Sequence, residues 1–174
     1  MDIIWQELTS GLPDVRQLVH VLIRLLAATL LGAVVGFQRE KAGKPAGLRT
    51  HILVSLGTAV FVLSCSGVGM DLEGLSRVIQ GIVTGIGFIG AGSILKLSEE
   101  RDIQGLTTAA GVWMTAAIGV SVGLGSLGVA LLSTLFTLIV LALAGPLEDR
   151  AEKRRIAEAE KRQAAEAKDK RQVG

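Results

Sequence analysis

The chain has 174 residues, of which 49% are hydrophobic and 20% charged, and its formal net charge at pH 7 is +2. Twenty-two glycines, three prolines and no tyrosine make a composition typical of a polytopic membrane protein, which argues against a soluble enzyme or a nucleic-acid binder. The single cysteine, Cys65, excludes an intrachain disulfide. No catalytic residue, cofactor or metal site is predicted.

Residues 1–17 are predicted to form an extracytoplasmic or interfacial segment, with a frayed terminus as the alternative. Five apolar runs follow, each close to the roughly 20 residues that a helix needs to cross the hydrocarbon core. Their bounds are Leu18–Phe37, Thr50–Val68, Val78–Leu97, Leu106–Leu124 and Leu127–Ala144. Gly125 and Ser126 favour a helical hairpin over one long helix through the last two runs. The predicted fold is all-α: a polytopic bundle of five transmembrane helices over 18–144.

The charges in the loops predict the orientation, because cytoplasmic loops carry an excess of Lys and Arg. The loop 39–49 holds four such residues, whereas 69–77 holds one beside two acids. The N-terminus and the loop 69–77 are therefore expected outside, and the loops 39–49 and 96–105 and the C-terminus inside.

The final segment, 145–174, is rich in Ala, Glu, Lys and Arg and is predicted to be a charged cytoplasmic helical tail. It has almost no apolar stripe and cannot form a core of its own. A solvated helix is the first interpretation, and a partner-binding coiled coil is the second.

The stretch GIGFIGAG, residues 85–92, matches the G-x-G-x-x-G spacing of a dinucleotide-binding turn. That turn must follow a strand and open a helix, whereas these glycines lie in the middle of an apolar run. The alternative is a membrane helix whose small residues, four apart, allow close packing. We expect two such faces, which would place the third run at the centre of the bundle between two neighbours.

Similar four-residue spacing in the first and fourth runs extends the expected contacts to them. The fifth run lacks glycine in its core and is expected at the lipid-facing edge. The residues predicted to mediate helix packing are Gly32, Gly36, Gly81, Gly85, Gly87, Gly92 and Gly119.

Arg24 is the only formally charged residue inside the runs away from their ends. An intramembrane Arg costs about 2.5–3.5 kcal/mol on insertion scales, so it marks a functional site unless it reaches the interface by snorkelling. Its expected partners are Asp71 and Glu73 in the outer loop. No Asp or Glu lies inside a run, which weakens a cation-transport hypothesis.

The loop REKAGKPAGLRTH, residues 39–51, is the densest polar feature near the membrane. It is interpreted either as a topology signal that touches anionic lipid or as an ordered network with Glu40 paired to Arg49 or Arg39.

Three segments resemble the MgtC/SapB family of bacterial membrane proteins: LGAVVGFQREKAGKPAGLRTHILVSLGTAVF, RVIQGIVTGIGFIGAGSIL and IQGLTTAAGVWMTAAIGVSVGLG. The resemblance implies a multi-pass protein of the bacterial inner membrane, associated with magnesium limitation, stress adaptation and virulence, and without enzymatic activity. Longer members end in a ligand-binding domain, which the charged tail does not resemble. The functional candidates from the charges and the family positions are Arg24, Glu40, Arg49, Asp71 and Trp113.

Two functional hypotheses follow. In the first, the protein is a non-enzymatic regulator whose small-residue faces contact other membrane proteins. In the second, it is a transporter or channel for magnesium or another small ion. The expected partners are the lipid bilayer and either a membrane protein or a second copy of the chain, with no nucleic acid.

Overall fold

The computed structural model describes residues 14–96 and 103–143, so the predictions for 1–13 and for the tail 145–174 lie outside the described residues. Its elements are the helices and strands α2 (Val15–Lys41), α3 (Leu48–Gly67), α4 (Leu72–Gly92), β1 (Leu95–Lys96), β2 (Ile103–Gln104) and α5 (Leu106–Gly123). A further apolar helix spans Leu127–Leu143. The chain forms two units, Met1–Thr137 and Leu138–Gly174, and α2 to α5 lie in the first.

The predicted all-α membrane fold is confirmed. The four helices α2 to α5 are long and apolar enough to cross a membrane, and Leu127–Leu143 is a shorter apolar helix. The turn at Gly125, where φ is +82°, separates that helix from α5, so the last two predicted runs are two helices and not one long helix. One deviation lies after α4, where the end of the third predicted span forms a two-residue antiparallel pairing with β2.

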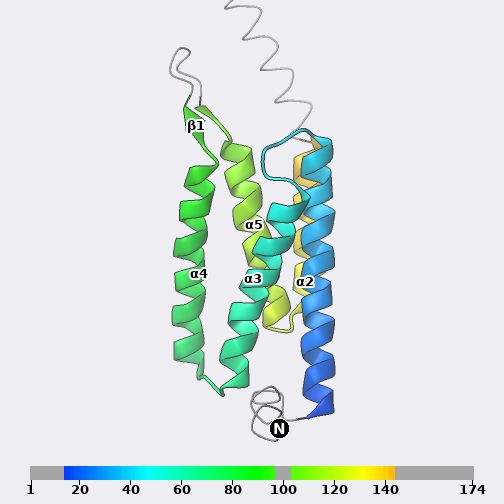
Figure 1. The fold of residues 1–174 in the computed structure, drawn as a ribbon, viewed down its shortest axis with the longest axis vertical. Helices are drawn as coiled ribbons and strands as arrows, with labels where there is room; N and C mark the ends of the chain where they lie inside the picture. The colour runs from blue at the N-terminus through cyan, green and yellow to red at the C-terminus, as the bar shows by residue number, and fades with distance from the viewer. Residues whose placement is uncertain (1–13, 97–102, 144–174) are drawn as a thin grey trace, which may run out of the picture. The chain divides into compact units, whose positions relative to one another are not determined.

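The connections between helices alternate between the two ends of the first unit, as Figure 1 shows. The loop 42–47 and the β1–β2 hairpin lie at one end. The turn 68–71, the turn 124–126 and the start of α2 lie at the other. This alternation is what spans crossing a membrane in opposite directions require; which end faces the cytoplasm stays a prediction from the loop charges.

α5 is the most buried of the four long helices and contacts α2, α3 and α4. Of the residues in its apolar stretch 56% are buried, against 11% in α4. α4 packs mainly on α5, contacts α3 only slightly and lies to one side in Figure 1. The expectation that the third span is central is therefore wrong: the small residues of α5, not those of α4, meet neighbours on several sides.

Glycines in α2 and α5 allow the backbones of three helices to approach each other closely. A Cβ added at Gly36 would lie 2.7 Å from Leu48 Cα, and one at Gly32 would lie 2.7 Å from His51 O. At Gly119 the added atom would collide with Thr58 and Ser55. These positions hold α2 and α5 against α3, in the manner of small-residue contacts between membrane helices.

The glycines of α4 behave differently from those of α2 and α5. A Cβ at Gly81, Gly85, Gly87 or Gly92 would meet no atom within 4 Å. Gly90 comes near another helix, at Ala109 of α5, and Gly74 in the first turn meets only Met70 and Asp71, which immediately precede α4. The expected contacts of α4 glycines within the chain are therefore absent from the described residues, because α4 uses one face, centred on Ile86 and Gly90, to reach the bundle.

This difference predicts the response to added methyl groups. Gly36→Ala should destabilise the bundle by about 1–3 kcal/mol, because the new Cβ overlaps the backbone of α3. Gly85→Ala, the matched control, should change stability little, since its Cβ enters open space and Ala favours a helix. Thermal unfolding in mild detergent measures both variants. Equal losses of stability would contradict the packing described here.

Candidate functional site

Arg24 binds the end of a helix rather than an acidic residue. Its Nη1 donates a hydrogen bond of 3.0 Å to the carbonyl oxygen of Gly123, in the last turn of α5. The last carbonyls of a helix have no partner within the helix and carry a partial negative charge, so they attract a guanidinium. A side chain at Gly125 would run into that guanidinium, so the small residue also makes room for it.

The outer-loop acids expected to pair with Arg24 have other partners, and that expectation is wrong. Asp71 is the N-cap of α4, where its Oδ1 accepts a hydrogen bond of 2.8 Å from Gly74 N. Glu73 pairs with Arg77 one turn later on the exposed surface of the same helix. Both acids thus stabilise the start of α4, as capping and i, i+4 pairing commonly do.

Arg39 is a buried cation that the sequence did not single out. Only 3% of the residue is exposed, and its Nη2 donates a hydrogen bond of 3.0 Å to Thr108 Oγ1. The contact joins the end of α2 to the first turn of α5. Its position at the edge of a predicted span made it look like one more loop cation, and only the continuation of α2 to Lys41 brings it inside.

His51 lies in the same interior and is fully buried. Its Nδ1 is 2.7 Å from Thr115 Oγ1, and that hydroxyl also donates to Gly111 O. Ser55, one turn further along α3, is buried too. Among the described residues, His51 Nε2 and Ser55 Oγ have no hydrogen-bond partner. We define the polar seam as Arg39, His51, Ser55, Thr108 and Thr115, which joins α2 and α3 to α5.

Glu40, in the last turn of α2, caps the N-terminus of α3. Its Oε2 accepts a hydrogen bond of 2.9 Å from Leu48 N, the first residue of α3, whose N-cap Gly47 has no side chain to serve this role. The partner of Glu40 that the structure shows is thus the N-terminus of α3, where negative charge is favoured, and not Arg49. Arg49 is exposed.

Trp113 of α5 is 46% exposed, and no hydrogen bond or ring contact involves it in the described chain. It lies at the surface of the bundle and does not join the polar seam. The described residues contain no group of three or more His, Cys, Asp or Glu side chains that could hold a metal ion.

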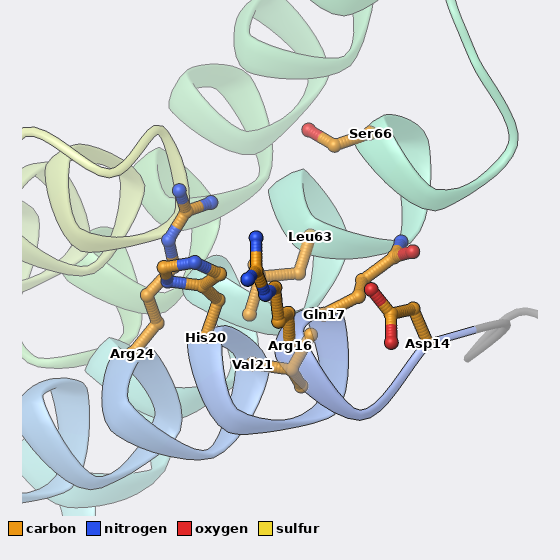
Figure 2. Close-up of a pocket in the computed structure, with 8 residues that line it drawn as sticks. All are labelled: Asp14, Arg16, Gln17, His20, Val21, Arg24, Leu63 and Ser66. Carbon is orange, nitrogen blue, oxygen red and sulfur yellow. The ribbon is translucent and has the colours of Figure 1, made fainter.

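A cleft opens beside Arg24, at the end of the bundle where α2 begins and α3 ends. Figure 2 shows the side chains of Arg16, His20 and Arg24 projecting from α2, with Leu63 and Ser66 of α3 opposite. The volume of the cleft is about 400 Å³.

Long apolar helices that pack through glycines, with a polar seam between them, define a multi-pass helical membrane protein. Its interior holds basic side chains and hydroxyl groups. The chain belongs to the MgtC family, whose profile matches residues 25–150. This confirms the resemblance drawn from the three sequence segments.

Individual relatives agree with this assignment. Protein SrpB of Synechococcus elongatus is 44% identical over 134 residues, which cover 68% of this chain and 71% of SrpB. "Putative magnesium transporter YhiD" of Escherichia coli K12 is 43% identical over 130 residues, covering 69% of this chain and 58% of that protein. Protein MgtC of Brucella abortus is 44% identical over 132 residues, covering 76% and 54%. The chain thus spans little more than half the length of the last two. No solved structure matches it.

The hydrogen bond between Arg39 and Thr108 should contribute more to the stability of the protein than the hydrogen bond of a buried threonine within its own helix. Thr108→Val should destabilise the protein by about 1.5–3 kcal/mol, since a buried guanidinium loses an acceptor. Thr134→Val is the matched control, because that buried hydroxyl bonds only to Ala130 O of its own helix. Thermal unfolding in detergent compares the two variants, and an equal effect would show that the interhelical bond adds nothing.

Glu40 allows a separate test of the cap on α3. Glu40→Ala should cost about 0.5–2 kcal/mol, because the first amide of α3 loses its acceptor. Glu40→Gln keeps an acceptor oxygen and should cost less. Hydrogen exchange of the Leu48 amide reports the site directly: protection should fall in the Ala variant and remain in the Gln variant.

Proposed function

We propose that this chain is a non-enzymatic regulatory protein of the bacterial inner membrane that acts by contacting other membrane proteins. A role connected with magnesium limitation and stress adaptation is what the resemblance to the MgtC/SapB family implies, and membership of the MgtC family supports it. The regulatory role is our inference from the distribution of small residues and charges over the helices.

The observation that carries the proposal is the unused glycine surface of α4. Within one fold, the glycines of α2 and α5 sit at backbone contacts, whereas Gly81, Gly85, Gly87 and Gly92 face open space. Gly81 and Gly85 also line a groove of about 610 Å³ between α3 and α4, whose other walls include Leu53, Phe61 and Ile82.

The expected ligand of this groove is an apolar transmembrane helix of another protein, with a small residue of its own at the contact. Membrane helices gain little from burying apolar side chains, since lipid is equally apolar, and associate where small residues let backbones approach. A groove lined by glycines in the middle of a span allows the backbone of a second helix to come this close. Its walls carry no formal charge, so the matching face of the partner must be uncharged as well.

The interior chemistry supports this proposal over transport. The seam offers Arg39, His51 and hydroxyl groups, and the sequence places no Asp or Glu inside a predicted span. Mg²⁺ prefers oxygen ligands and is usually held through carboxylates.

Partner binding is tested by in vivo cross-linking followed by purification in mild detergent. The native chain should retain a specific membrane protein that Gly85→Leu loses, because the added Cβ enters open space and the larger side chain occupies the groove. Phe88→Leu is the control: Phe88 is 84% exposed and does not line the groove, so its variant should keep the partner. Retention of the same partner by Gly85→Leu would contradict the proposal.

Transport of magnesium or another small ion is the second candidate, favoured by the name of the Escherichia coli relative. Purified chain reconstituted into vesicles that contain a magnesium-sensitive dye decides between the two. The regulatory proposal predicts no flux above that of empty vesicles. Flux that Thr108→Val or His51→Gln abolishes would instead place an ion path along the polar seam.

A further inference from the structure

The cleft beside Arg24 combines a polar wall with an apolar one. Its lining residues are Asp14, Arg16, Gln17, His20, Val21 and Arg24 from α2 and its N-cap, and Leu63 and Ser66 from α3. A volume of about 400 Å³ lies within the range of roughly 300–1,000 Å³ found for small-ligand sites. Figure 2 shows the basic side chains reaching into the space between the two helices.

The basic side chains share one helix face because they are spaced four residues apart. Arg16, His20 and Arg24 therefore stack along α2, one turn after another. Asp14 is the one acid in the lining, and it forms no ion pair with a described residue. Two permanent positive charges thus face one negative charge, and the cleft is electropositive.

Most of the hydrogen-bond donors in the cleft are unused. In the part of the chain that the structure describes, the side chains of Arg16 and His20 make no hydrogen bond or ion pair. Arg24 is half-buried and held in place by one bond, from Nη1 to Gly123 O, which leaves further N–H groups of its planar guanidinium for a ligand. The planar guanidinium of arginine can donate two parallel hydrogen bonds to the oxygens of a phosphate, so it matches that group in geometry as well as in charge.

The depth of the cleft fits the phosphate layer of a bilayer. α2 has 27 residues, or about 40 Å at 1.5 Å per residue, and exceeds a hydrocarbon core of about 30 Å. Arg16 lies in its first turn and Arg24 about two turns deeper. The basic face thus runs from the headgroup region toward the acyl chains, and Val21 and Leu63 give it an apolar side.

We propose that this cleft binds a phosphate-bearing anion, with Arg16, His20 and Arg24 as the donors. A phospholipid headgroup and free phosphate are two sources of the same chemistry. The proposal does not depend on the regulatory role, since it concerns the opposite side of α3 from the groove formed with α4.

The test uses the full chain in uncharged detergent, titrated separately with short-chain phosphatidylglycerol, inorganic phosphate and an uncharged short-chain diacylglycerol. The native chain should bind phosphatidylglycerol saturably, with one molecule per chain. Arg16→Gln combined with His20→Gln should weaken that binding at least tenfold. Both residues are exposed, so the thermal midpoint without ligand should not change and will verify that the variant is folded.

The control variant combines Lys41→Gln with Arg49→Gln, which removes two exposed basic side chains at the other end of the bundle. It should change the affinity by less than twofold. Equal weakening by both variants would show only a general attraction of anions to basic surfaces and would overturn the proposal. Binding of the diacylglycerol as tightly as phosphatidylglycerol would show that the phosphate plays no role and would overturn it as well. Binding of phosphatidylglycerol without inorganic phosphate identifies the lipid headgroup as the source, whereas competition by inorganic phosphate identifies a site open to the free ion.

Discussion

Backbone contact between α2, α3 and α5 is the constraint on which the rest of the first unit depends. Gly32 and Gly36 bring α2 against the start of α3, and Gly119 brings α5 against Ser55 and Thr58. Short side chains such as Thr and Ser reach across a helix interface only where the backbones are this close. In the packing that these glycines allow, Arg39 reaches Thr108 and His51 reaches Thr115.

The polar seam in turn fixes the register of these helices. Apolar faces alone can slide along one another in a membrane, because every lipid-exposed alternative is equally apolar. A buried guanidinium or imidazole cannot slide, since it would leave its hydroxyl partner for hydrocarbon. Two such pairs, seven residues apart on α5, therefore lock α5 to both α2 and α3. Among the described residues, α4 makes no side-chain hydrogen bond of this kind and packs on α5 through the face centred on Ile86 and Gly90.

The sequence was sufficient for the apolar helices, the turn at Gly125 and the family, because apolar length and glycine turns are local properties. It could not tell which glycine stripes touch a neighbour: the four-residue spacing in α4 is as regular as that in α2, yet only the latter meets a backbone. The partner of Arg24 could not be predicted, because the acceptor is not an acidic side chain but a carbonyl at a helix end, which has no sequence signature. Arg39 and His51 were missed because both lie at the edge of a predicted span, where a shift of a few residues in a helix boundary moves a side chain from a loop into the interior.

Arg24 and Arg39 of α2 show how burial separates an arginine with a structural role from one whose charge is available to a ligand. Arg39 is closed off between helices and bonded to Thr108, so a ligand could reach it only by opening the bundle. Arg24 is bonded to a carbonyl on one side and faces a cleft on the other, where Arg16 and His20 extend its charge toward the surface. A carbonyl oxygen offers a partial charge, so it orients the guanidinium without neutralising it. The cation at this end of the helix is thereby held in position while most of its charge remains available to an anion.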